Sequence, residues 1–174
     1  AIKGVNGLGK STLLKTMLGI IPAFGGTVEL DYLAQPAYFE QEHIGSSKTA
    51  LYEIWDMYPS MTNAGVRGAL ARCGLTSQHI ETQCRVLSGG EKVRLALARL
   101  LLQHANFLIL DEPTRNFSPL SGPEVRGILK QFPGAIISVS HDRKYITEVC
   151  NTVYRLTRVG LEKMEMPRFR EEDF

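Results

Sequence analysis

The sequence predicts an α/β fold with a mainly parallel sheet and a small helical subdomain, and three observations support this. Two continuous apolar runs, 106–110 and 135–140, indicate strands buried on both faces, as in parallel sheets covered by helices. Segments of helical periodicity alternate with these runs, whereas residues 46–86 show helical patterns only. With 174 residues, 44% of them hydrophobic, the chain can bury one sizeable core, or one core and a small lobe.

A glycine-rich loop starts the predicted core. Residues 4–12, GVNGLGKST, match the phosphate-binding pattern G-x-x-x-x-G-K-[ST]. Its glycines let successive backbone N–H groups converge on a phosphate, Lys10 is expected to reach the β- and γ-phosphates, and the Ser11 hydroxyl is placed to ligate Mg²⁺. A glycine-rich turn before an ordinary helix is the simpler alternative. The candidate nucleotide-phosphate-binding residues are Gly4, Asn6, Gly7, Gly9, Lys10, Ser11 and Thr12.

The rest of residues 1–45 is expected to complete the first part of this core. Residues 11–19 predict a helix with an apolar face, which Gly19 and Pro22 end, and its positive N-terminal end would face the same anion. Strands are expected near 27–30 and 37–39. Only a three-residue stub stands before the loop, where a buried strand is usual, so an N-terminally truncated fragment is expected.

Residues 46–86 predict the helical subdomain. Apolar residues recur at helical spacing at positions 51, 54, 55 and 58, and again at 66, 70 and 73 before Gly74. Residues 87–160 then return to the core, with helices at 91–102 and 123–131 and strands at 106–110, 135–140 and 152–156. Residues 161–174 are expected to form a C-terminal tail of a single domain.

Polar residues follow the two central strands, at the sheet edge where parallel sheets bind ligands. Asp111 and Glu112 come directly after one strand, and His141 follows the next. In a phosphoryl-transfer site Asp111 would hold the Mg²⁺ shell, Glu112 would polarise the attacking water, and His141 would donate a hydrogen bond to the γ-phosphate. An acidic turn capped by Pro113 and a structural histidine are the simpler alternatives.

A glutamine adds a further candidate ligand. Gln41, after the strand near 37–39, can supply an amide oxygen to Mg²⁺ or to the attacking water. Gln35 competes for this role, and Gln41, in the string Tyr-Phe-Glu-Gln, is preferred.

The string LSGGE begins a predicted helix with an unusual pair of glycines. Ser88 and Glu91 have the spacing of a capping box, which any helix can use. Gly89 and Gly90 cost helix stability at the first helical positions, but bare backbone there lets an anion approach the positive helix end. Anion binding by Ser88, Gly89 and Gly90 is therefore preferred over capping alone.

Composition adds weaker constraints. A net charge of +2 neither favours nor excludes a nucleic-acid partner. The three cysteines form no C-x-x-C pair and no metal-ligand spacing, which favours a reducing, cytoplasmic setting. Because no apolar run approaches 18 residues, we expect no membrane span in the chain.

Five strings, GVNGLGKST, YFEQE, LSGGE, LILDEPT and SVSHD, occur in this order, and over about residues 1–160 the chain resembles the nucleotide-binding domain of ATP-binding cassette (ABC) proteins. The resemblance implies a P-loop NTPase core, a helical lobe and an antiparallel β lobe that is largely missing here. It implies that Ser88–Gly90 bind ATP held by an opposed domain and that Gln41 reaches Mg²⁺ and water. Asp111, Glu112 and His141 would be the Mg²⁺ carboxylate, the general base and the γ-phosphate switch.

Within the family the chain resembles the ABC-F branch, whose members carry two cassettes in one soluble chain and act on ribosomes. The short spacing from Lys10 to Gln41 and the strings SGGEKVRLALARLLL and SVSHDRKYI carry this resemblance. It implies a C-terminal cassette of the antibiotic-resistance or translation-factor type. The chain departs from the branch after DEPT, where Asn-His-Leu-Asp is common and residues 115–118 read Arg-Asn-Phe-Ser. Ser118 lacks the charge of the aspartate that usually makes a cross-domain contact.

The resemblance implies that two ATP molecules with Mg²⁺ bind between two ABC domains, that binding closes the pair and that hydrolysis opens it. The leading hypothesis is an ABC-F ATPase that couples this cycle to the ribosome and turns over weakly as an isolated fragment. An ATPase subunit docked on a membrane permease is one alternative. A nucleotide-dependent binding module with little turnover is another.

Overall fold

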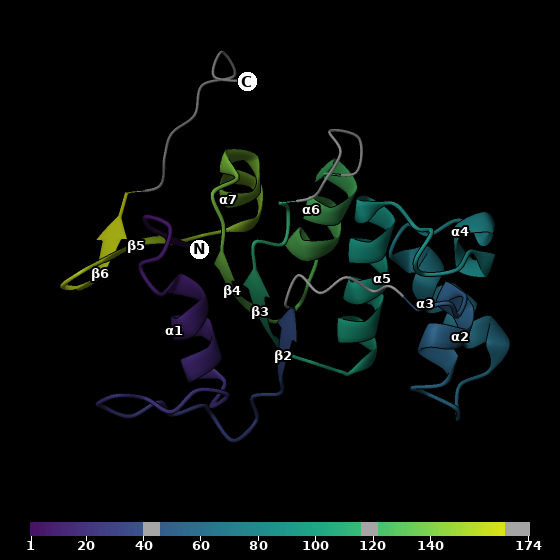
Figure 1. Cartoon of the computed structure of the whole chain (residues 1–174), viewed down its shortest axis with the longest axis horizontal. Helices are drawn as coiled ribbons and strands as arrows, with labels where there is room; N and C mark the ends of the chain where they lie inside the picture. The colour runs from purple at the N-terminus through teal and green to yellow at the C-terminus, as the bar shows by residue number, and fades with distance from the viewer. Residues whose placement is uncertain (40–45, 116–121, 166–174) are drawn as a thin grey trace, which may run out of the picture.

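The computed structural model describes residues 1–39, 46–115 and 122–165. Its strands form one sheet in the order β2-β3-β4-β1-β5-β6 (Figure 1). The strands are β1 Ile2–Lys3, β2 Pro36–Phe39, β3 Phe107–Asp111, β4 Ala135–Val139, β5 Val153–Thr157 and β6 Gly160–Met164. The helices are α1 Lys10–Met17, α2 Ala50–Trp55, α3 Asn63–Arg72, α4 Ser77–Glu81, α5 Gly89–Leu102, α6 Gly122–Lys130 and α7 Arg143–Val149.

Strands β2, β3, β4, β1 and β5 pair in parallel, and β5 and β6 pair antiparallel. The carboxyl ends of the parallel strands therefore meet at one edge of the sheet. This topology and the separate group of helices α2, α3 and α4 confirm the predicted α/β fold with a mainly parallel sheet and a small helical subdomain. The stub before the glycine loop is strand β1, inserted between β4 and β5.

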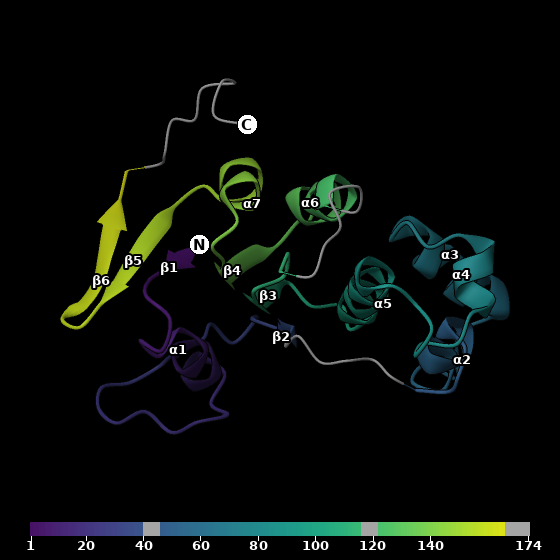
Figure 2. The same cartoon turned by 45° about the horizontal axis from the view of Figure 1, so that its top comes forward.

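Helices cover both faces of the sheet, as the continuous apolar strands predict. Figure 2 shows α1 on one face and α5, α6 and α7 on the other. Because side chains alternate along a strand, Leu108 and Leu110 pack with the residues of α5, α6 and α7, whereas Ile109 packs with Leu14 of α1. All four side chains are almost fully buried, so β3 is fixed from both sides.

The helical subdomain has a core of its own, built from α2, α3, α4 and one face of α5. Each short helix begins at a threonine whose side chain accepts a backbone N–H: Thr49, Thr62 and Thr76. The chain entering this subdomain is tied to the chain leaving it by a bridge between Thr49 and Gln83. Backbone hydrogen bonds from Cys84 to Lys48 (2.9 Å) and from Ala50 to Thr82 (3.1 Å) flank this bridge.

The prediction of a strand at residues 27–30 is wrong. These residues are exposed and have no regular secondary structure. A strand needs a hydrogen-bonded neighbour, and the described part of the chain provides none beside this segment. The Val28 and Leu30 side chains, which suggested the strand, remain partly exposed.

The segment expected to begin the C-terminal tail contains strand β6. The backbone turns after Thr157, where Gly160 adopts a φ of 139° that only glycine tolerates well, and β6 returns along β5. The exposed, mixed-charge residues of β6 give no buried apolar run in the sequence. Residues 166–174 of the expected tail lie outside the described residues.

Replacing Ile109 by alanine should lower the free energy of unfolding by about 2–5 kcal/mol, because it leaves a cavity between the sheet and α1. Urea denaturation followed by circular dichroism measures this change. As a control, Val86→Ala, at a side chain that is 67% exposed, should shift stability by no more than about 0.5 kcal/mol. Equal midpoints for the two variants would contradict the burial of β3.

Candidate nucleotide-binding site

The glycine loop links β1 to α1 and depends on backbone shapes that glycine provides. Gly7 and Gly9 have φ values of 80° and 92°, in the left-handed region that other residues rarely adopt. Gly9 is also the N-cap of α1, and its carbonyl accepts the first helical hydrogen bond from Leu13 at 2.8 Å. The loop therefore ends at the first helical turn, whose N–H groups have no partner within the helix and are suited to an anion.

Gly4 is required for a different reason. A Cβ atom at this position would lie 2.9 Å from the backbone oxygen of Leu156 in β5, so only glycine allows the loop to cross this strand so closely. The Gly4 carbonyl accepts a hydrogen bond from Lys10 Nζ at 2.8 Å, and the Val5 carbonyl accepts one at 3.1 Å. The Lys10 ammonium is thus held against the inside of the loop, with the residue only 8% exposed.

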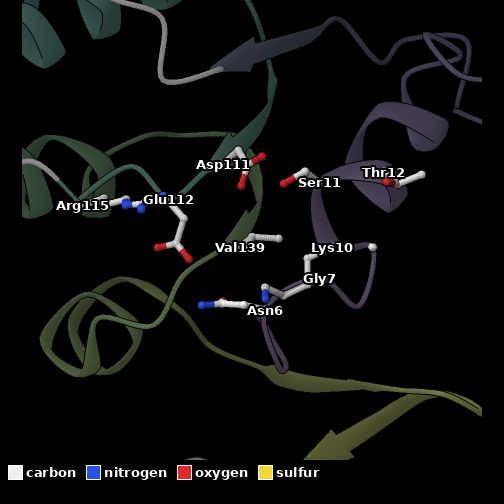
Figure 3. A pocket seen from close by; sticks show the side chains of 10 residues that line it. Asn6, Gly7, Lys10, Ser11, Thr12, Asp111, Glu112, Arg115 and Val139 are labelled. Carbon is white, nitrogen blue, oxygen red and sulfur yellow. The ribbon is translucent and has the colours of Figure 1, made fainter.

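The loop and the acidic pair at the carboxyl end of β3 line one cavity of about 420 Å³ (Figure 3). Its walls are Asn6, Gly7, Gly9, Lys10, Ser11, Thr12, Asp111, Glu112, Arg115 and Val139. Among the loop candidates, Gly4 alone lies outside this wall. The structure therefore brings together two motifs that are separated in the sequence by the whole helical subdomain.

Glu112 has an unusual backbone. Its φ is 48°, which is uncommon for a residue with a side chain, and such outliers are frequent at functional sites. Its N–H donates to the Val139 carbonyl at 2.9 Å, which ties the turn to β4. His141 Nε2 lies 3.6 Å from Glu112 Oε1, and the histidine side chain is half-exposed. The two residues are therefore close enough to act on the same bound group.

Ser88, Gly89 and Gly90, here called the serine–glycine tip, lie at the N-terminus of α5 and do not line this cavity. Both hydrogen bonds of the capping box are present: Glu91 N–H donates to Ser88 Oγ (3.4 Å), and Ser88 N–H donates to Glu91 Oε2 (2.9 Å). His79 Nε2 of α4 lies 3.5 Å from Glu91 Oε1, which connects the tip to the helical subdomain.

Burial raises the pKa of Glu91, but the backbone N–H and the hydroxyl of Ser88 outweigh it, and the net pKa lies below its ordinary value. A lowered carboxyl pKa in the folded state favours folding above the ordinary glutamate range, and this contribution is lost as the pH falls through the lowered pKa. The capping box is therefore fully formed at neutral pH.

Of the two glutamine candidates, the described residues include Gln35 but not Gln41. Gln35 precedes β2, and its N–H donates to Asn106 Oδ1 at 2.8 Å, just before β3. It therefore lies at the amino ends of the strands, opposite the edge that carries Asp111, and cannot serve this cavity. Gln41 lies outside the described residues, two positions after the carboxyl end of β2, and Ser118 lies outside them as well.

Arg115 was not predicted as a site residue, although it lines the cavity. Its N–H donates to the Glu112 carbonyl at 3.1 Å, so a tight turn places it next to the acidic pair. The sequence signal was its position directly after DEPT, but an arginine there belongs to no phosphate-binding pattern.

The donors on this cavity fit Mg²⁺. The Ser11 hydroxyl and the Asp111 carboxylate both line it, and hard oxygen ligands of this kind suit a Mg²⁺ ion that also binds substrate phosphates and water. The described residues contain no group of three or more histidine, cysteine, aspartate or glutamate side chains that could hold a metal by themselves. A magnesium ion would therefore arrive with a phosphate ligand.

A glycine loop that feeds a helix N-terminus, facing a carboxylate-bearing strand end in a parallel sheet, defines a P-loop nucleotide-binding domain. Residues 1–115 match the family model described as ABC transporter. The chain belongs to this family, as the sequence motifs predicted, and is a nucleotide-binding domain of the ABC ATPase type.

Curated relatives support the same assignment. The uncharacterized ABC transporter ATP-binding protein YfmM of Bacillus subtilis (strain 168) is 39% identical over 155 residues, which are 88% of this chain and 30% of YfmM. ABC transporter F family member 5 of Arabidopsis thaliana is 35% identical over 166 residues, 93% of this chain and 24% of that protein. The chain thus spans less than a third of the length of these relatives.

The fold is shared with a solved cassette. The dimeric structure of MJ0796 in a post-hydrolysis state, bound to ADP and Pi, superimposes with a TM-score of 0.77 and 21% sequence identity. The match covers 97% of this chain and 85% of that one. Among the described residues, every helix falls short of the length and apolar character that a membrane span needs.

Replacing Gly9 by alanine should destabilise the chain by about 1 kcal/mol or more, because alanine is strained at a φ of 92°. Gly127 is the matched control, since it lies in α6 with open space where a Cβ would point. Gly127→Ala should raise stability by roughly 0.5–1 kcal/mol through helix propensity. Thermal unfolding of both variants tests the loop geometry, which a stabilising Gly9→Ala would contradict.

Proposed function

We propose that the chain binds Mg·ATP in the cavity between the glycine loop and the end of β3, and hydrolyses it when paired with a second ABC domain. The observation that carries this proposal is the shared cavity of Lys10, Ser11, Asp111 and Glu112. ABC cassettes are ATPases as a class, and these side chains are those that phosphoryl transfer requires.

The loop would hold the phosphates. Backbone N–H groups from Gly7 to Thr12 would surround the β-phosphate, and Lys10 Nζ would exchange its bonds with loop carbonyls for contacts to phosphate oxygens. Ser11 and Asp111 would hold the Mg²⁺ ion. When bound, this ion neutralises phosphate charge and orients the terminal phosphate.

Glu112 would accept a proton from the attacking water as a general base. Its backbone conformation and the bond from its N–H to the Val139 carbonyl support this role, because they fix the main chain from which the side chain reaches the cavity wall. His141 would donate a hydrogen bond to the γ-phosphate beside Glu112, because His141 Nε2 lies 3.6 Å from Glu112 Oε1. Gln41 is proposed to contribute to Mg²⁺ or to the water from the end of β2.

The serine–glycine tip supports the need for a second domain. It lies outside the chain's own cavity, yet its bare helix N-terminus is suited to an anion. We infer that Ser88, Gly89 and Gly90 complete the ATP site of an opposed cassette. The MJ0796 cassette, whose solved structure is a dimer, agrees with such a pairing.

The relatives favour an ABC-F protein. Several carry this name, such as ABC transporter F family members 5 and 2 of Arabidopsis thaliana. We therefore propose a cytoplasmic ABC-F cassette that couples nucleotide-driven closure to the ribosome, in translation regulation or in protection from antibiotics. An ATPase subunit of a membrane transporter is the second candidate, which the name of the family model favours. Copurification with ribosomes would support the first, and copurification with a membrane permease would support the second.

Replacing Lys10 by alanine should abolish tight binding of Mg·ATP, because the loop loses its only charged contact to the β- and γ-phosphates. Isothermal titration of the purified chain measures the affinity. Lys130→Ala, at the exposed end of α6, removes the same charge elsewhere and should leave the affinity unchanged. Unaltered affinity of Lys10→Ala would exclude the loop as the phosphate site.

Replacing Glu112 by glutamine should lower ATP turnover by roughly 10²-fold or more and retain ATP binding, since the amide cannot accept the proton of water. Phosphate release should be measured in a chain that joins this cassette to a second one. Glu29→Gln, at an exposed position, is the matched control. Unchanged turnover would remove Glu112 from the base role, and ATP binding without turnover in the unmodified protein would indicate a binding module.

A further inference from the structure

Arg115 is a charged side chain of the cavity that the roles above leave unused. It lines the wall together with Glu112 and Lys10. Figure 3 shows Arg115 on the Glu112 side of the cavity, whereas Lys10 lies on the loop side. A bound nucleotide would therefore lie between two cationic residues, one from the glycine loop and one from the turn after β3.

The guanidinium of Arg115 is available to a ligand. Three other arginines of the described residues form ion pairs with carboxylates, in the pairs Arg67–Glu81, Arg94–Glu124 and Arg126–Glu148. Within residues 1–39, 46–115 and 122–165, no carboxylate lies within ion-pair distance of Arg115, including the neighbouring Glu112. An uncompensated cation on the wall of a polar cavity favours an anionic occupant.

The backbone beneath Arg115 is well fixed. Its N–H is bonded to the Glu112 carbonyl, and the preceding Thr114 is buried, with 8% exposure. Pro113 restricts the same turn. The side chain therefore starts from a defined point three residues after the candidate base, at the end of the cavity where the terminal phosphate would lie.

We propose that Arg115 binds the terminal phosphate of ATP from within the same chain and stabilises its charge during hydrolysis. This inference rests on the proposed ATP site. A guanidinium remains charged at any physiological pH and can donate two parallel hydrogen bonds to phosphate oxygens. Arginines that contact the transferred phosphoryl group in this way accelerate other nucleotide hydrolases.

The step balances without a proton from Arg115. The oxygen of water bonds to the γ-phosphorus, the bond from this phosphorus to the β–γ bridging oxygen breaks, and ADP leaves with that electron pair. Glu112 accepts the proton of the water, and Arg115 keeps its charge throughout. Because ADP lacks the γ-phosphate, Arg115 should distinguish ATP from ADP.

The test is a pair of titrations, with Mg·ATP and with Mg·ADP, on the chain carrying Glu112→Gln so that hydrolysis does not interfere. Adding Arg115→Ala should weaken ATP binding about tenfold and change ADP binding less than about twofold, as expected for one lost charge-assisted phosphate contact. Arg115→Lys should recover part of the ATP affinity. Arg72→Ala, at an exposed arginine of α3, removes the same charge and should change neither affinity.

Equal losses of ATP and ADP affinity in Arg115→Ala, or no loss of either, would overturn the inference. Arg115→Gln, which keeps the size of the side chain, repeats the test if thermal unfolding shows that the alanine variant is destabilised. Failure of the proposed function has a different signature, because the chain with arginine at position 115 would then bind neither nucleotide.

Discussion

Val139 pairs with Ile2 of β1 on one side and with Asp111 of β3 on the other. Because these strands run parallel, the glycine loop, the acidic pair and His141 all leave the sheet at the same edge. The Val139 carbonyl also accepts the Glu112 N–H, so the same residue fixes the turn that carries the candidate base. A one-residue slip of β3 would turn Asp111 to the opposite face of the sheet. The register of the central strands is therefore the constraint on which the whole cavity depends.

Helix α5 packs against both the sheet and the helical subdomain. Val93 and Leu97 on one face pack against the sheet, whereas Leu95 and Ala98 on another face pack into the core of the subdomain. The serine–glycine tip at the start of α5 is also joined to α4 through Glu91 and His79. The tip is thus held by both parts of the molecule, and a movement of the subdomain relative to the sheet would displace it.

The sequence was sufficient wherever a feature depends on neighbouring residues. The buried run 106–110 and the Ser88–Glu91 pair predicted β3 and the start of α5 to within two residues, because burial and capping are local patterns. The segment 27–30 failed because a strand also depends on a partner, which no local pattern reveals. β6 was missed because the exposed residues of an edge strand lack an apolar signal. Arg115 was missed as a cavity residue because its meaning depends on a fold that brings it opposite Lys10.

The bridge between Thr49 and Gln83 brings the two ends of the helical subdomain together. A segment whose ends meet behaves as an insertion, and such segments can be exchanged between related proteins with little effect on the host. Transplanting residues 50–82 from a relative would change the exposed surface of the subdomain. The separation between its two ends, at Thr49 and Gln83, would stay the same. The apolar face of α5, with Leu95 and Ala98, and the contact between Glu91 and His79 would need matching counterparts. Evolution could therefore vary the surface of the helical subdomain separately from the glycine loop and the acidic pair.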